Sequence, residues 1–365
     1  MPTTYSYSQQ SEAPHGKIKS LQGLRFLFIT LIVASHLFPR FDFGGEGGVA
    51  FFFVLSGFVL SWSQGLKVAA GQFCPIAFLR HQLCKVYPLM LLMVVVMWFA
   101  DVHAGHGWLW KELLANVFLL KSWLLSDKYL FSILGTSWFV CDIFFLYLCF
   151  KPLYLFTSRQ SKFVGGATWA LVLAVYLPFL VGLPAGDFNR VLYSFPPFRL
   201  IDFWLGIALY RFYVSARGQR LMSFLFHWSP LRLDILMLLW SLCFLLSYLA
   251  YQYVLPVNVR GAMLFWPFVV VVVFLCVILE QSGRSTLSVR LLASKPMLFL
   301  GDMSMEIFLT HQPVLYVVNM VALHLGIYVT HPLAVQLVCV PCILLVAWLS
   351  QRYFSRPVYR WLSKW

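Results

Sequence analysis

Two residues that could do chemistry together, Arg25 and His36, lie within one apolar stretch of the sequence. Their spacing amounts to about three helical turns plus about 20°, so a helix presents both on one face, about 16 Å apart along its axis. A guanidinium binds phosphate, and an imidazole can take a proton from a hydroxyl near neutral pH. The alternative is that Arg25 reaches toward lipid headgroups and His36 bonds a neighbouring carbonyl. The sequence leaves both open.

Asp142 is a candidate partner for the imidazole. It follows Trp138 near one end of a later apolar stretch, at the depth predicted for His36. A carboxylate can orient an imidazole and favour its protonated form. A structural hydrogen bond to a neighbouring helix explains Asp142 equally well. Arg199 and Asp202, one helical turn apart, are expected to form a local ion pair rather than a site.

Two other short segments could contact a ligand. Arg80 and Lys85 stand just before another apolar stretch, where they could pair with phosphates, although anchoring of the chain at a membrane surface is the simpler explanation. Ser56 and Gly57 interrupt a run of large apolar residues. They allow either tight helix packing or the close approach of a ligand.

Metal binding is not expected. Cys339 and Cys342 form a CxxC pattern inside an apolar stretch, and His103 and His106 form an HxxH pattern, but neither has further ligands nearby in the sequence. A structural zinc site needs four ligands.

The composition says what kind of elements must position these residues. Of 365 residues, 61% are hydrophobic and only 11% are charged, against about 25% charged residues in soluble domains. The solvent for most of this surface must therefore be lipid. The net charge of +14 does not indicate a nucleic-acid partner, because the basic residues lie between apolar runs rather than on one polar domain.

We predict an all-α fold, a polytopic bundle of about ten transmembrane helices, each spanning about 20 residues. The predicted spans are Gln22–Pro39, Val49–Gly65, Cys84–Asp101, Trp138–Phe156, Val164–Leu183, Arg199–Val214, Leu233–Tyr253, Met263–Glu280, Met303–Leu325 and Pro332–Arg352. The segment Trp108–Leu125 is interpreted as an interfacial or re-entrant helix rather than a span, because it carries lysines among its tryptophans. A crossing here would also invert the orientation of the chain that follows and worsen the distribution of basic residues.

The distribution of Lys and Arg predicts the orientation. With a cytoplasmic N-terminus, 18 basic residues fall on the inside and 7 on the outside, as the positive-inside rule requires. Both termini are then cytoplasmic, with tails at residues 1–20 and 353–365 around a membrane domain at 21–352. The polar N-terminus predicts that the first span is retained and not cleaved as a signal peptide.

Several segments together resemble the acyltransferase-3 family of integral-membrane O-acyltransferases, bacterial enzymes that acylate cell-surface sugars and lipids. The similarity covers essentially the whole chain. It is carried by Leu21–Arg25 with His36, Phe52–Phe58, Lys85–Pro88, Trp138–Phe139, Ile201–Gly206 and Leu300–His311. The sequence departs from the family pattern at Gln82, where an arginine is common, and at Asp142, where some members have a glutamate one residue later.

The resemblance implies a donor, an acceptor and a place in the cell. The donor would be cytoplasmic acyl-CoA, with acetyl-CoA the expected form, bound by Arg25, Arg80 and Lys85. The acceptor would be a hydroxyl of a saccharide or lipid-linked glycan on the far side of a bacterial cytoplasmic membrane.

The resemblance also implies roles at the reacting atoms. His36 would be the general base and Asp142 its orienting carboxylate, while Ser56 and Gly57 would approach the thioester. Glu306 and His311 fall in a family landmark without an assigned role. The alternative function is a transporter or exporter of a polysaccharide or lipid intermediate, which would also have many spans and intramembrane charges.

Overall fold

The computed structural model describes residues 16–39, 41, 43–160, 162–254, 258, 264–284 and 286–364. These residues form helices and no strand. A helix stands at each of the ten predicted spans: α1 (Lys19–Leu37), α2 (Gly45–Ala69), α3 (Pro75–His103), α6 (Ser137–Arg159), α7 (Lys162–Gly182), α8 (Pro196–Tyr213), α10 (Pro230–Val254), α12 (Trp266–Gln281), α15 (Ser304–His324) and α17 (Pro332–Ser350).

Eight of the helices in the described part of the chain are long and apolar enough to cross a membrane, which confirms the polytopic all-α fold. The two predicted spans outside this set are α8, which carries Arg199, Asp202 and Arg211, and α12, an apolar helix of 16 residues. Both pack inside the bundle, where neighbouring helices shield polar groups from lipid.

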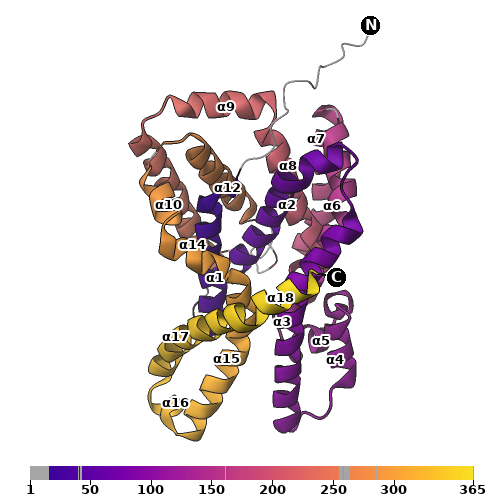
Figure 1. The fold of residues 1–365 in the computed structure, drawn as a ribbon, viewed down its shortest axis with the longest axis vertical. Helices are drawn as coiled ribbons and strands as arrows, with labels where there is room; N and C mark the ends of the chain where they lie inside the picture. The colour runs from indigo at the N-terminus through magenta and orange to yellow at the C-terminus, as the bar shows by residue number, and fades with distance from the viewer. Residues whose placement is uncertain are drawn as a thin grey trace.

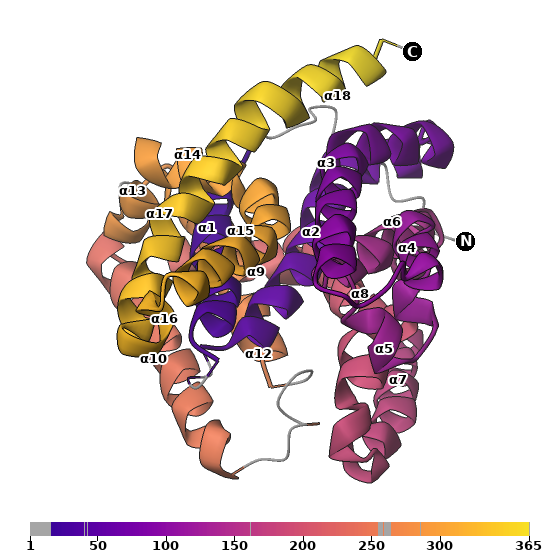
Figure 2. The same cartoon turned by 90° about the horizontal axis from the view of Figure 1, so that it is seen from below.

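Shorter elements connect the long helices: α4 (Trp110–Val117), η1 (Lys121–Trp123), α5 (Asp127–Leu130), η2 (Ala185–Asp187), η3 (Asn189–Tyr193), α9 (Ala216–Phe226), α13 (Leu287–Leu292), α14 (Lys295–Asp302), α16 (Ile327–Thr330), η4 (Gln351–Ser355) and α18 (Arg356–Leu362). The predicted interfacial segment is thus broken into α4 and η1, and neither is long enough to span. In Figure 1, α9 crosses one end of the bundle, and the turn α16 between α15 and α17 lies at the opposite end together with the ends of α3 and α4. Figure 2 shows the molecule from that end.

The core is organised around α2, which crosses α8 at backbone contact. A Cβ atom added to Gly57 would lie 2.0 Å from the carbonyl oxygen of Phe203, and one added to Gly206 would lie 2.0 Å from that of Val54. At each glycine, the backbone of the other helix occupies the space where a side chain would be. Small residues permit this close packing between membrane helices. Because α8 lies directly against Gly57, the geometry favours helix packing over contact with a ligand for this residue.

The N-terminal end of α1 is fixed by a carboxylate from α12. Glu280 accepts hydrogen bonds from the backbone N–H groups of Lys19 and Ser20 and from the Ser20 hydroxyl, each at 2.7 Å. The first N–H groups of a helix have no intrahelical acceptor, and here a distant residue supplies one. Glu280 thereby fixes the start of the helix that carries Arg25 and His36.

Candidate active site

The stripe predicted on α1 faces a narrow pocket. Arg25, Ile29 and Ile32 line it from α1, Phe52 and Phe139 from α2 and α6, and Ser304, Met305 and Phe308 from α15. Arg25 and Ile32 are seven residues apart, about two turns on one helix face. His36 comes one turn after Ile32 on the same face, just beyond the lining residues. The pocket therefore has a guanidinium at one end and approaches an imidazole at the other.

Beside His36 the structure places a second imidazole, that of His311 on α15. The two ring centroids are 5.0 Å apart and the rings are tilted by 51°. His36 is exposed at the protein surface, whereas His311 is fully buried. Nδ1 of His36 donates to the Ile32 carbonyl at 2.9 Å, and Nδ1 of His311 donates to the Phe308 carbonyl at 2.8 Å. Each ring is thus attached to its own helix through Nδ1.

At the other end of the stripe, Arg25 lies among charged groups of both signs. Its electrostatic neighbours include Tyr147, Asp302 and Glu306, and Lys85 lies within electrostatic range of Arg25 and of both carboxylates. The buried Nε atom of Arg25 has no hydrogen-bond partner in the described structure. This cluster joins Lys85 to Arg25, two of the three predicted donor-binding cations.

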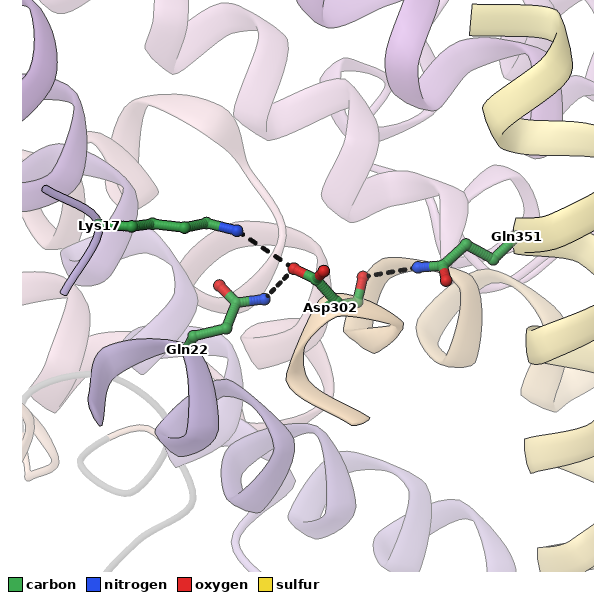
Figure 3. Close-up of polar contacts among 4 residues, drawn as sticks. All are labelled: Lys17, Gln22, Asp302 and Gln351. Carbon is green, nitrogen blue, oxygen red and sulfur yellow. Dashed lines mark hydrogen bonds and ion pairs between the residues drawn. The ribbon is translucent and has the colours of Figure 1, made fainter. Parts of the chain in front are cut away.

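Asp302 connects this end of the site to three elements (Figure 3). Its carboxylate accepts a hydrogen bond from the Gln22 amide at 2.7 Å and pairs with Lys17 at 3.2 Å. Its backbone carbonyl accepts a hydrogen bond from Gln351 at 3.0 Å. The contacts tie the start of α1 to the α14–α15 junction and to η4.

The remaining predicted donor contacts are placed differently. Arg80 is exposed on α3 and is not among the charged neighbours of Arg25 or Lys85. Ser56 lies closer to the site, because its hydroxyl donates to the Phe52 carbonyl at 2.7 Å and interacts with the Tyr147 side chain beside Arg25. Gly57 turns toward α8, as described above.

Asp142 has other neighbours than His36. It is fully buried on α6, and the polar and charged groups that act on it are Ser122, Arg199 and Asp202. Neither of its carboxylate oxygens has a hydrogen-bond partner with good geometry in the described residues. The described contacts thus bring His311, and not Asp142, to His36.

Arg199 forms the expected local ion pair. Its Nη1 atom donates to Asp202 at 2.8 Å, with both side chains almost completely buried. Nε of Arg199 donates to the Tyr193 carbonyl at 2.5 Å, and Trp266 donates to the other oxygen of Asp202. The prediction of a local pair is confirmed.

The segment between α3 and α6 is held by a buried lysine. The Lys121 ammonium donates to the carbonyls of Ser132 and Leu134 and to the Ser137 hydroxyl, at 3.0, 2.7 and 3.1 Å. Burial lowers the pKa of Lys121 to about 7. Three oxygen atoms of neutral groups thus receive the three N–H bonds of its charged form.

A cavity of about 340 Å³ with both polar and apolar lining residues opens on this same segment. Its lining includes a hydrogen bond between His106 and Asp101 at 3.3 Å and the ion pair of Glu112 with Lys128 at 2.9 Å. The segment continues to Thr136, whose backbone N–H donates to Gln312 at 3.1 Å, the residue after His311. The wall of the cavity is therefore linked by the chain to the neighbourhood of the histidine pair.

His311, Glu306 and Tyr147 are the site residues to which sequence reasoning gave no role. A signal for the first was present, because Ser304, Phe308 and His311 repeat at helical spacing and stand in a family landmark. Tyr147 gave none, since nothing in the sequence shows that α6 faces Arg25. Among the described residues no group of three or more side chains suited to a metal ion occurs.

Comparison with protein families gives one match over most of the chain. The profile of the acyltransferase-3 family, described as an acyltransferase domain, matches residues 18–352. No solved structure matches.

Three curated relatives are similar in sequence. Acyltransferase MdmB of Streptomyces mycarofaciens is 26% identical over 53% of this chain and 57% of its own length. Peptidoglycan O-acetyltransferase OatA of Listeria monocytogenes is 25% identical over 93% of this chain and 56% of its own length. Protein 2 in picA locus of Rhizobium radiobacter is 33% identical over 24% of this chain and 47% of its own length. The chain thus spans about half the length of the relatives it matches.

Proposed function

Because this chain belongs to the acyltransferase-3 family, we propose that it is a membrane O-acyltransferase that uses acyl-CoA, with acetyl-CoA the expected donor. The acceptor is a hydroxyl of a cell-surface saccharide or lipid-linked glycan. One relative is named for O-acetylation of peptidoglycan, which supports an acceptor of this class. The site lies in a bacterial cytoplasmic membrane, with the Arg25 end toward the cytoplasm.

The observation that carries the proposal is the pocket lined by Arg25, on the face of α1 that continues to His36 one turn beyond Ile32. Arg25 and Lys85 offer cationic groups to the phosphates of CoA. The side chains that line the pocket are mostly apolar and suit the uncharged pantetheine arm, and an arm seated there excludes water that would hydrolyse the thioester. The pocket has a volume of about 10 Å³ in this structure, so the helices around it must separate to admit the arm.

His36 is the general base in this proposal. Because its Nδ1–H bond is used by the Ile32 carbonyl, the lone pair of the neutral ring is on Nε2. Nε2 takes the proton of the acceptor hydroxyl as its oxygen attacks the thioester carbonyl. The carbon–sulfur bond then breaks, and the proton is passed to the leaving thiolate. General-base catalysis of this kind contributes about 10²–10⁴-fold in rate.

The cavity on the segment between α3 and α6 is our candidate for the acceptor saccharide. Its carboxylates and serine offer hydrogen-bond acceptors for sugar hydroxyls. The exposed and nearly parallel rings of Trp108 and Trp110 lie beside it on the same segment, with centroids 5.8 Å apart. Aromatic faces of this kind can stack against the apolar face of a sugar ring.

The test is transfer from radiolabelled acetyl-CoA to membrane glycans by the His36→Ala variant. We expect transfer and release of free CoA to fall by about 10²–10⁴-fold, because the base is missing, while the protein inserts and is recovered normally. His324→Ala is the matched control, since this exposed histidine on α15 lies far along the helix from the pair. Full activity of His36→Ala would remove His36 as the base.

A further inference from the structure

We propose that His311 is a positioning residue of the catalytic centre, which shares with His36 the proton that leaves the acceptor hydroxyl. The inference rests on the proposed function and deepens it, because it gives the reaction a second imidazole. It begins from the contact between the two rings, whose centroids are 5.0 Å apart.

The hydrogen bonds of both rings fix where a proton can go. A backbone carbonyl only accepts hydrogen bonds, so each Nδ1 must carry its hydrogen. In the neutral state the free lone pair of each ring is therefore on Nε2, on the side turned away from its own backbone. The two rings therefore carry the same kind of free atom, and with ring centroids 5.0 Å apart they are close enough for a proton taken by one to be stabilised by the other.

The burial of His311 indicates that its free nitrogen has a use. Nε2 of His311 is completely buried and has no hydrogen-bond partner in the described structure. Leaving a buried polar atom unpaired costs about 1–3 kcal/mol. Protonated His36 would supply the missing donor, because its new N–H bond can donate to Nε2 of His311. The other ring in contact with His311 is Phe308, which offers no proton acceptor.

The proton balance of the step is simple. The acceptor oxygen forms a bond to the acyl carbon, and its proton moves to Nε2 of His36. The new N–H bond of His36 donates to Nε2 of His311, so one proton is held between the two rings. When the carbon–sulfur bond breaks, the thiolate takes this proton, and both imidazoles return to the neutral state.

The test compares His311→Leu with His311→Gln, with His324→Leu as the control on the same helix. Leu removes the acceptor, whereas the amide oxygen of Gln keeps one. With acetyl-CoA and a glycan acceptor, we expect His311→Leu to lower kcat about 10²-fold and to leave the KM for acetyl-CoA unchanged. His311→Gln should regain part of the lost kcat, and it remains informative if the Leu variant does not fold.

A second acceptor separates a positioning role from a structural one. Hydroxylamine attacks a thioester without prior loss of a proton, so acetyl transfer to hydroxylamine should persist in His36→Ala and in both His311 variants. Unchanged kcat in His311→Leu, or equal loss toward glycan and hydroxylamine, overturns the inference and leaves the role of His36 intact. Absence of any transfer from acetyl-CoA by the unaltered protein overturns the proposed function and the inference together.

Discussion

Arg25 and Arg199 are both arginines within membrane-length helices, yet their surroundings differ. Arg199 is almost fully buried, pairs with Asp202 at 2.8 Å, and lies over the rings of Phe53 and Tyr193, with its guanidinium carbon 5.9 and 4.8 Å from their centroids. Arg25 is half-buried, lines a pocket, and has no ion pair of its own among the described residues. One buried nitrogen of each guanidinium lacks a hydrogen-bond partner in the described structure, Nε in Arg25 and Nη2 in Arg199, so the ion pair is what separates them. A charge inside a membrane protein is costly in both cases. What distinguishes a ligand site from a structural contact is whether the protein itself supplies the partners.

The largest expected effect is on the structural arginine. Arg199→Leu leaves Asp202 buried without its cation, and breaking a buried ion pair costs about 3–5 kcal/mol. We expect a marked fall in the melting temperature of the detergent-purified protein and in its yield. A normal melting temperature of this variant would show that Arg199 does not stabilise the fold.

The next effect concerns the pocket arginine. Arg25→Leu should raise the KM for acetyl-CoA about 10–100-fold, because a hydrogen bond to a charged group contributes about 1.5–3 kcal/mol. Its melting temperature should stay close to that of the unaltered protein, since none of the ion pairs among the described residues includes Arg25. Arg159→Leu is the control, because Arg159 is an exposed residue at the end of α6. If Arg25→Leu lowers stability and leaves the KM for acetyl-CoA unchanged, Arg25 is a structural residue and does not bind the donor.

A smaller effect should come from Lys121, near the Arg199 cluster. Its folded-state pKa is lowered to about 7, whereas an unfolded lysine keeps its proton to about pH 10.4. Between these values the unfolded state binds more protons, so stability rises with pH. From pH 7 to 9 the gain is on the order of 2 kcal/mol. Melting curves at both values should show this rise in the unaltered protein and a smaller one in Lys121→Met.

Much of the fold could be predicted from the sequence, because lipid imposes a minimum length and a polarity on each span. All ten predicted segments are helical. The local ion pair of Arg199 and the place of Arg25 and His36 on one helix could also be predicted, since both depend on spacing within one helix. Predictions of this kind need no knowledge of which helices are neighbours.

The contacts between helices could not be read in the same way. Asp142 was matched to His36 by depth alone, but α6 presents it to Arg199 and Ser122. His311 reaches His36 because α1 packs against α15, a neighbour more than 250 residues later in the chain. For Gly57 the sequence permitted a ligand or a helix, and only the crossing with α8 distinguishes them.

The carboxylate of Glu280 at the start of α1 has a consequence for biogenesis. A ribosome releases the segment with Arg25 and His36 long before it reaches residue 280, so the first turn of α1 is made before its Glu280 acceptor exists. Nascent chains stopped before Glu280 cannot form these three hydrogen bonds. The start of α1 therefore gains these contacts only after the much later helix α12 has been synthesised.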